Sequence, residues 1–377
     1  MNTRVPGQVS FSCVVLEGTS YEVGRAQAVE LGDDSERLSY LTPTLPFLER
    51  YSQSQAEDEL AYMDRYCPGI GDEVRGTADA LGVGIADIAF LGGQPKGSGC
   101  SHFAVLPAAT RVGHTLVGQT MDSSPEDLDL RLCATRVQGK AAHIGFSDMV
   151  MGRTQGLNEH GLCVTTSWGA PGVWPEGKGL PYFAAVRTLL DRCDSAAQAV
   201  EVLLSLPIRW CTNFILADRV GRIALVEVSG EHRGVRWLTA EERLVCATNH
   251  YTLPEMLPYD LSRRRESVAR HRTIEGYLRR AAPYVDLEAM RELLSQQMPH
   301  GVCQHHYSSG LGTLWCSVAD VTGGTIEVCF GSPCSVQNSW YTFSLDDAMG
   351  QKTYLAHLPD EVPPSGFWER LPAGRDK

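Results

Sequence analysis

A cysteine that directly follows a glycine-rich stretch has the clearest chemical potential in this sequence. Gly97, Ser98 and Gly99 lead into Cys100, and a strand-like run begins at Ser101. Glycine before the cysteine permits the positive φ and strained backbone that attack of a side chain on its own preceding carbonyl requires. If the Cys100 thiol attacked the Gly99 carbonyl, an ester-like intermediate would form and hydrolyse. Cys100 would then become a new chain terminus.

A terminal cysteine carries its own base. A free α-amine has a pKa of about 7.7 to 8.0, so it can take the proton of the thiol on the same residue near working pH. Nucleophile and base then need no separate histidine. The alternative is that Cys100 is one of twelve buried thiols beside an ordinary loop. The Gly-Cys dipeptide alone favours that alternative, so the rest of the sequence must decide.

Several motifs occur in the order that is typical of one enzyme family. They are GTSYEVG at 18–24 followed by Arg25, Gly99-Cys100, GQTMD at 118–122, GLNEHGL at 156–162, Thr248-Asn249-His250, and a hairpin that ends at Gly331-Ser332-Pro333. With these motifs the sequence resembles the acyl-coenzyme A:6-aminopenicillanic acid acyltransferase family of N-terminal-nucleophile hydrolases. The resemblance implies an α+β fold, a four-layer αββα sandwich of two stacked antiparallel sheets.

The resemblance also implies roles for single residues. Cys100 matches the nucleophile that cleavage generates, and Asp122 matches the acidic residue that holds amine and nucleophile in register. Asn249 matches the asparagine whose amide helps to form the oxyanion hole, a donor worth about 3 to 4 kcal/mol. From the residues alone, an Asx turn before Ser123 explains Asp122 better, and a loop amide that caps a strand end explains Asn249 equally well.

Some positions depart from the pattern of more distant relatives, the conjugated bile acid and penicillin V hydrolases. Those enzymes place an arginine three residues before the aspartate, where this chain has Gln119, so guanidinium assistance to the nucleophile is not supported. Ser167 and Trp168 lie near the second oxyanion donor of these relatives but match it only loosely. We retain Gln119, Ser167, Trp168 and His250 as candidate substrate-binding residues. The Asn-Glu-x-Gly-Leu stretch from Asn158 is expected to fix a tight turn.

The elements that must position these residues change along the chain. In the first hundred residues, apolar positions at helical spacing over 70–81 end at Gly82, and a second helix is expected within 43–66. Strands and hairpins are predicted at 101–106, 114–119, 131–137, 213–217, 222–228, 314–319 and 325–330. Further helices are expected after Pro181, after a capping box of Ser195 and Gln198, and within 260–297.

These patterns divide the chain into three parts. Residues 1–99 are a helical N-terminal segment that would become the α chain after self-cleavage. Residues 100–350 are the catalytic core and would become the β chain. Residues 351–377 are polar and proline-rich, and we expect them to form a loosely attached tail.

Composition excludes several classes of function. The chain has 33 lysine plus arginine against 45 aspartate plus glutamate, a net charge of −12, which argues against binding to nucleic acid or anionic lipid. No apolar stretch is long enough for a secretory signal or a membrane span. Twelve cysteines without a Cys-x-x-Cys pair indicate mostly reduced, buried thiols in a cytoplasmic protein. The glycines form no phosphate loop before Lys-Ser or Lys-Thr.

Two further features are expected to be structural. The run Cys303-Gln304-His305-His306 has metal-ligating residues, but no second cluster at zinc spacing accompanies it, so no metal is predicted. The basic run 263–265, together with Arg270 and Arg272, is interpreted as a solvated helix face.

The sequence therefore predicts a self-processing N-terminal-cysteine amidohydrolase or acyltransferase without a cofactor. Its partners would be a small-molecule amide or acyl-coenzyme A thioester and, for transfer, an amine acceptor, with secondary metabolism as the expected setting. The oligomeric state is left open. Two alternatives are a binding protein that keeps the sandwich but never matures, and an ordinary thiol hydrolase that pairs Cys100 with a separate histidine such as His250. Cleavage before Cys100 would distinguish these three functions.

Overall fold

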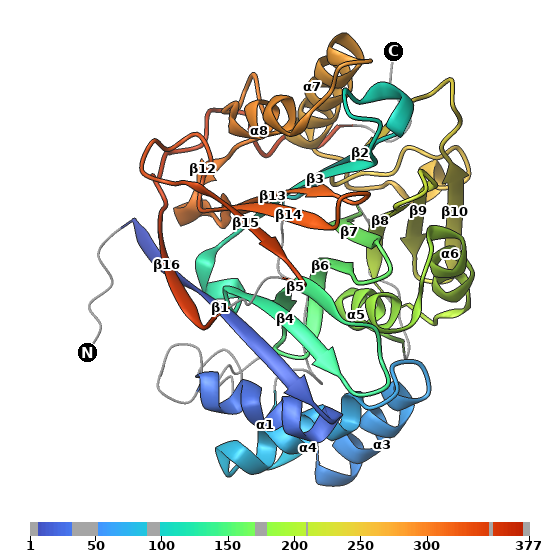
Figure 1. The fold of residues 1–377 in the computed structure, drawn as a ribbon. Coiled ribbons are helices and arrows are strands. Elements are labelled where there is room, and N and C mark those ends of the chain that lie inside the picture. Colours follow the sequence, from blue (N-terminus) through green and yellow to red (C-terminus); the bar gives the residue numbers. More distant parts are fainter. Residues whose placement is uncertain are drawn as a thin grey trace.

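The computed structural model describes residues 7–31, 52–88, 99–169, 179–208, 210–346 and 350–371. Two sheets are stacked on each other, and helices cover the outer face of each sheet (Figure 1). The four layers confirm the predicted αββα sandwich, which is the architecture of N-terminal-nucleophile hydrolases.

The larger sheet contains nine strands among the described residues, in the order β10-β9-β8-β7-β6-β5-β4-β1-β16. Neighbours pair antiparallel except β1 with β4, which are parallel. The strands are β1 Gln8–Gly18, β4 Arg131–Val137, β5 His143–Asp148, β6 Gly152–Asn158, β7 Leu162–Trp168, β8 Cys211–Asp218, β9 Ile223–Ser229, β10 His232–Trp237 and β16 Lys352–His357.

The smaller sheet has the order β11-β2-β3-β13-β14-β15, and β12 pairs with β13 beside that path. All of these pairs are antiparallel. The strands are β2 Ser101–Val105, β3 Leu116–Ser123, β11 Leu244–Ala247, β12 His305–His306, β13 Leu311–Asp320, β14 Thr325–Phe330 and β15 Trp340–Ser344. Among the candidate site residues, Gln119 and Asp122 lie on β3, and Cys100 lies immediately before β2.

Helices α7 (Arg265–Ala281) and α8 (Leu287–Ser295) cover the smaller sheet, and α5 (Tyr182–Arg192) and α6 (Ala196–Ser205) cover the larger one (Figure 1). The helices α1 (Ser20–Leu31), α3 (Gln53–Asp64) and α4 (Ile70–Leu81) pack at the end of the larger sheet. The predicted helix stop at Gly82 is confirmed, since Gly82 ends α4 with φ of 68°. Half of the predicted capping box forms: the Ser195 hydroxyl accepts from the Gln198 backbone N–H, but the Gln198 side chain accepts from the Asp194 N–H at 2.8 Å. The predicted strands and hairpins are also confirmed.

The core between the two sheets is apolar and tightly packed. The Phe146 ring on the larger sheet stacks on Trp315 of the smaller one, with ring centroids 4.1 Å apart. Eleven of the twelve cysteines are buried, as expected, and Cys334 is partly exposed. No helix in the described parts of the chain is both long enough and apolar enough to cross a membrane.

Two details of the predicted division of the chain are wrong. Part of the N-terminal segment is the eleven-residue strand β1, which joins the larger sheet beside β4. The C-terminal stretch is not loosely attached over its whole length, because β16 pairs along β1 from Gln8 opposite His357 to Cys13 opposite Lys352. Ala356 on β16 and Leu358 just after it are buried in the core between the sheets. Burial of these side chains stabilises an edge strand that the polar, proline-rich flanks conceal in the sequence.

Candidate active site

The Gly99–Cys100 peptide lies immediately before β2, beside the end of β3. Ser101 on β2 is paired with Thr120 on β3, and the Gly99 amide continues the ladder by donating to the Asp122 carbonyl at 2.8 Å. The Cys100 side chain is 2% exposed, and its sulfur lies 3.4 Å from the Met121 sulfur. The strand register therefore fixes the peptide against the residue that the sequence predicts as its acidic partner.

One side-chain amide contacts both the Gly99 carbonyl and the Asp122 carboxylate. Gln304 Nε2 donates to the Gly99 oxygen at 3.1 Å and to Asp122 Oδ2 at 2.8 Å. The backbone of Gln304 is held by Thr313 on β13, because the Thr313 hydroxyl accepts from the Gln304 backbone N–H at 2.9 Å. The donor is thus directed at the carbonyl that self-cleavage would attack.

The Asp122 carboxylate is completely buried and hydrogen-bonded across the sheet. Thr313 Oγ1 donates to Asp122 Oδ1 at 2.6 Å, and Thr120 Oγ1 donates to Oδ2 at 3.1 Å. Burial raises the pKa of Asp122 to about 6, while the charge of Arg270 and the three donated hydrogen bonds act in the opposite direction. These contacts connect Asp122 to neighbouring strands and not to a turn before Ser123. The group is mainly ionised at neutral pH.

A buried arginine on α7 connects Cys100 with Asn249. Arg270 Nη1 donates to the Cys100 carbonyl at 2.8 Å and to Ser101 Oγ at 2.7 Å, and Nη2 donates to Asn249 Oδ1 at 2.8 Å. Glu266, one helical turn earlier, accepts from Arg270 Nε at 2.9 Å. Both side chains of this ion pair are buried, so removing their charges from water costs free energy. The hydrogen bonds that Arg270 donates to Glu266, Cys100, Ser101 and Asn249 offset this cost.

The predicted solvated helix face is therefore wrong for part of the basic run. Arg270 has no exposed surface and Arg263 is 3% exposed, whereas Arg265 and Arg272 are exposed. Arg270 faces the sheet because α7 packs on β2 and β11, and Glu266 neutralises its charge. Arg263 precedes α7 and is paired with Asp260.

Asn249 is oriented from several sides. Its backbone N–H donates to Ser267 Oγ at 2.8 Å, and its side-chain Nδ2 donates to the Trp168 carbonyl at 3.2 Å. The side-chain oxygen of Asn249 accepts from Arg270, which leaves the side-chain nitrogen of Asn249 as its donor group. The structure thus joins Cys100, Asp122 and Asn249 in one buried region through Gln304 and Arg270.

The remaining candidates lie around this region. Trp168 contacts Asn249 as described, and the Ser167 hydroxyl donates to the Thr248 carbonyl at 2.5 Å. The Gln119 amide donates to the Thr166 carbonyl at 3.0 Å. His250 Nδ1 lies 2.8 Å from Ser267 Oγ and 3.1 Å from Thr248 Oγ1. Burial, reinforced by His271 and nearby arginines, lowers the pKa of His250 well below its usual value, so its ring is neutral.

Comparison with known proteins identifies the family of this chain. The model of the family "Acyl-coenzyme A:6-aminopenicillanic acid acyl-transferase" matches residues 110–335, more than half of the chain. The chain belongs to this acyl-transferase family. The match includes Asp122, Asn249 and Gln304 and begins after Cys100. A search of curated proteins by sequence found no match.

Solved structures similar to this acyl-transferase family member include three hydrolases. Penicillin V acylase from Agrobacterium tumefaciens is 14% identical, with a TM-score of 0.44 over 65% of this chain and 86% of that chain. A variant of conjugated bile acid hydrolase from Clostridium perfringens is 13% identical, with a TM-score of 0.45 over 70% and 99%. A Caenorhabditis elegans N-acylethanolamine-hydrolyzing acid amidase orthologue is 12% identical, with a TM-score of 0.42 over 59% and 93%.

Sequence reasoning missed two side chains of this region, Gln304 and Arg270. Gln304 lies in the stretch 303–306, whose cysteine and histidines suggest only metal binding. Arg270 belongs to the basic residues that the sequence pattern places on a solvated helix face. The prediction that glycine at position 99 permits a positive φ is also wrong, because Gly99 does not adopt a positive φ. A Cβ atom there would lie 2.3 Å from Leu311 Cδ1 and 3.0 Å from Gln304 Nε2. Glycine is needed at this position for close packing.

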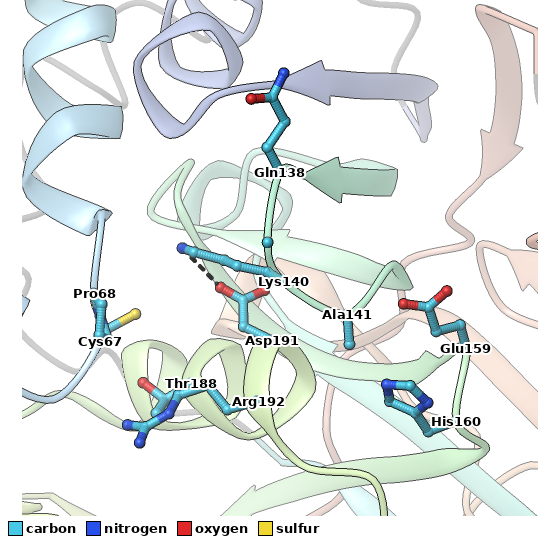
Figure 2. A pocket seen from close by; sticks show the side chains of 11 residues that line it. Cys67, Pro68, Gln138, Lys140, Ala141, Glu159, His160, Thr188, Asp191 and Arg192 are labelled. Atoms are coloured by element: carbon cyan, nitrogen blue, oxygen red, sulfur yellow. Dashed lines mark ion pairs between the residues drawn. The ribbon is translucent and has the colours of Figure 1, made fainter.

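A cavity of about 640 Å³ lies elsewhere in this family member, among α5, the β4–β5 connection and the residues before α4 (Figure 2). Its walls include the ion pair of Lys140 Nζ and Asp191 Oδ2, 3.1 Å apart. None of Cys100, Asp122 and Asn249 lines it. We assign the candidate active site by the chemistry around Cys100. The thiol that lines the cavity is Cys67, and burial raises its pKa to about 11, so it is protonated at neutral pH.

Proposed function

We propose that this chain cleaves itself between Gly99 and Cys100 and then uses Cys100 as an N-terminal nucleophile on a small amide or acyl-coenzyme A thioester. The observation that carries the proposal is the hydrogen bond from Gln304 Nε2 to the Gly99 carbonyl oxygen. A donor at this oxygen stabilises negative charge that develops when the carbonyl is attacked. Membership of the acyl-transferase family supports the same class of reaction.

Self-cleavage would proceed in two steps. The Cys100 sulfur attacks the Gly99 carbonyl carbon, its proton passes to the departing Cys100 nitrogen, and the C–N bond breaks to give a thioester and a free α-amine. Water then hydrolyses the thioester, which yields the Gly99 carboxylate and restores the thiol. Gln304 stabilises the oxyanion at each addition because its amide lies at the Gly99 oxygen.

The mature reaction would use the same sulfur on an external acyl group. The α-amine of Cys100 takes the thiol proton and later returns a proton to the leaving group, while Asp122 positions that amine. The Asn249 amide supports the oxyanion of the tetrahedral intermediate. Water or an amine then accepts the acyl group. We favour amide hydrolysis or transfer on a small secondary metabolite.

The two fragments would remain together after cleavage. Strand β1 of the N-terminal fragment lies between β4 and β16, which both belong to the C-terminal fragment. Its side chains also contribute Phe11 and Cys13 to the core between the sheets. Cys100 is 2% exposed in the uncleaved chain, so the proposal requires that the end at Gly99 withdraws and opens a path to the sulfur.

Intact-mass measurement with amino-terminal sequencing tests this function. Wild-type protein should yield fragments of about 11 and 30 kDa, in proportion to their lengths within 41.2 kDa, and the larger should begin at Cys100. The Cys100→Ala variant should remain whole. An intact wild-type chain that is active and depends on Cys100 would instead support an ordinary thiol hydrolase, with His250 as the first base to test. An intact, inactive chain would support a binding protein.

A further inference from the structure

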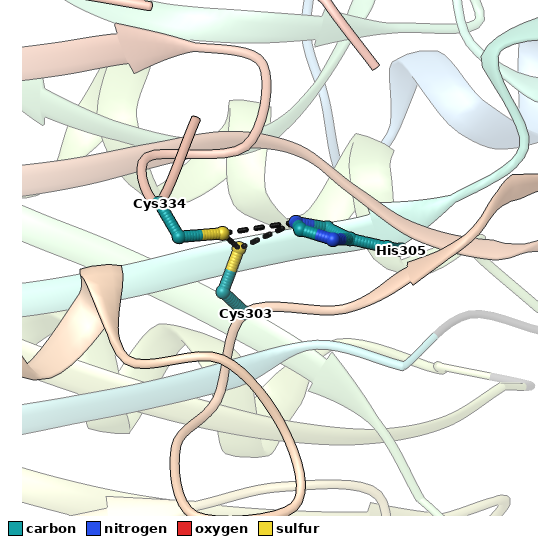
Figure 3. Close-up of side chains that lie close together, drawn as sticks. All are labelled: Cys303, His305 and Cys334. Carbon is teal, nitrogen blue, oxygen red and sulfur yellow. Dashed lines mark hydrogen bonds between the residues drawn. The ribbon is translucent and has the colours of Figure 1, made fainter. Parts of the chain in front are cut away.

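A second group of reactive side chains lies close to the active site but is not part of it. Cys303 and His305 flank Gln304 at β12, and Cys334 follows β14 (Figure 3). The two sulfurs are 2.8 Å apart, and His305 Nε2 lies 2.9 Å from the Cys334 sulfur and 3.6 Å from the Cys303 sulfur. All three donor atoms lie within 4.8 Å of one another. Cys303 and His305 are buried, and Cys334 is partly exposed.

The orientation of the His305 ring is set from its other side. Nδ1 lies 3.2 Å from Glu361 Oε1 and 3.2 Å from Gln297 Nε2, and Gln297 Nε2 also donates to both Glu361 oxygens at 2.9 Å. A carboxylate that accepts from Nδ1 leaves the lone pair of Nε2 directed at the two sulfurs. Metal-bound histidines commonly have this carboxylate partner, which fixes their tautomer and orientation. Hydrogen bonding between two thiols alone would not require an oriented imidazole.

We propose that Cys303, His305 and Cys334 form a binding site for a thiophilic divalent cation, with Zn²⁺ as the best match. Two thiolates and one imidazole suit zinc, which prefers tetrahedral sulfur and nitrogen ligands. A tetrahedral ion would hold the sulfurs about 3.7 Å apart, given Zn–S bonds of about 2.3 Å. The Cys334 side chain must therefore turn outward by about an ångström, and its partial exposure leaves room for this and for a water as fourth ligand.

The absence of a second ligand cluster led the sequence analysis to predict no metal here. The third ligand is a single residue, Cys334, which lies 31 positions after Cys303 in the sequence. The β13–β14 hairpin and the turn after it bring Cys334 close to Cys303 in space. A single cysteine at that distance has no spacing signature.

The site would stabilise the active-site segment. Gln304 lies between the two ligands at 303 and 305, and its amide contacts both Gly99 and Asp122. A cation held by both flanking residues and by Cys334 would fix the backbone at Gln304 and so the position of its donor. The role is structural, because two of the ligands flank Gln304 in the sequence, and the Gln304 side chain contacts Gly99 and Asp122.

Metal binding by the reduced full-length chain tests the site without relying on activity. After chelation and removal of the chelator, the protein should take up one equivalent of Zn²⁺, and Co²⁺ should give the visible and sulfur charge-transfer bands of tetrahedral thiolate coordination. Zn²⁺ should raise the melting temperature. The Cys303→Ala and Cys334→Ala variants should neither take up one equivalent of Zn²⁺ nor show the rise in melting temperature. Cys193→Ala, a buried thiol in the layer of α5 and α6, should keep both.

Several results would overturn the site. They are no Zn²⁺ uptake by folded, reduced wild type, uptake by Cys334→Ala equal to wild type, or Co²⁺ spectra without sulfur bands. A Cys303–Cys334 disulfide in the isolated protein, combined with no uptake after reduction, would identify a redox pair instead. None of these readouts depends on cleavage at Cys100, so the site and the proposed function can fail separately.

Discussion

Replacement of Gln304 by methionine should slow self-cleavage strongly while leaving the chain folded. Methionine keeps the length of the side chain but removes the amide that lies 3.1 Å from the Gly99 oxygen and 2.8 Å from Asp122 Oδ2. Loss of one oxyanion donor costs about 2.7–4 kcal/mol, or about 10²–10³-fold in rate. The distance to Gly99 is at the long end of the effective range, so we expect about 100-fold.

Pulse-labelled cell-free translation followed by intact-mass analysis would measure the conversion of precursor to fragments from the moment of synthesis. Gln155→Met is the matched control, because Gln155 is also buried, but its amide donates at 2.7 Å to Ser317 Oγ and not to the Gly99–Cys100 peptide. The control should lower the melting temperature but keep the cleavage rate within a few-fold of wild type. Wild-type cleavage by folded Gln304→Met would refute the assigned role of the amide.

Two further predictions concern charge. Arg270→Met should lower the free energy of unfolding by at most about 3–5 kcal/mol, because the buried Glu266 keeps only its ion pair with Arg264. Arg279→Met removes the exposed pair with Glu275 at the same spacing on α7 and should cost less than about 1 kcal/mol; equal losses in urea denaturation would contradict this. The raised pKa of Asp122 means that the folded state binds more protons than the unfolded state between pH 3.8 and about 6, so stability falls as pH rises through that window. In an uncleaved Cys100→Ala background, Asp122→Asn should therefore gain ~3 kcal/mol relative to its parent across that window, and a difference that does not change with pH would be evidence against a buried ionised carboxylate.

Local signals predicted most of the secondary structure. Strands β4 and β14 have the predicted bounds, and α4 and α6 end and begin at the expected Gly82 and Ser195. Each of these boundaries is set by neighbouring residues: a left-handed glycine, a capping hydroxyl or a tight turn. β16 was missed because an edge strand needs only a few buried side chains, and its polar flanks resemble a tail.

The active site was predictable only in part. Cys100 and Asp122 could be identified because they lie on one hairpin within a recognisable order of motifs. The contacts of Gln304 with Asp122 and of Arg270 with the Cys100 carbonyl span 182 and 170 residues. Such contacts arise when β12 pairs with β13, the neighbour of β3, and when α7 packs on β2 and β11, and neither composition nor periodicity encodes these pairings.

The shared amide of Gln304 also provides a physical reason why cleavage would open the site. Before cleavage, the Gln304 side-chain amide donates hydrogen bonds to the neutral carbonyl of Gly99 and to the carboxylate of Asp122. After cleavage Gly99 would end in a carboxylate, which would compete with Asp122 for the Gln304 amide and for the positive charges of Arg270 and of the new α-ammonium group of Cys100. Like charges at this separation repel strongly where water is excluded. The carboxylate with fewer fixed hydrogen bonds is the one that withdraws from this competition, and Asp122 is held by Thr313 and Thr120. The Gly99 end has no comparable set of donors in the region described, so repulsion would drive its withdrawal and expose the Cys100 sulfur to substrate.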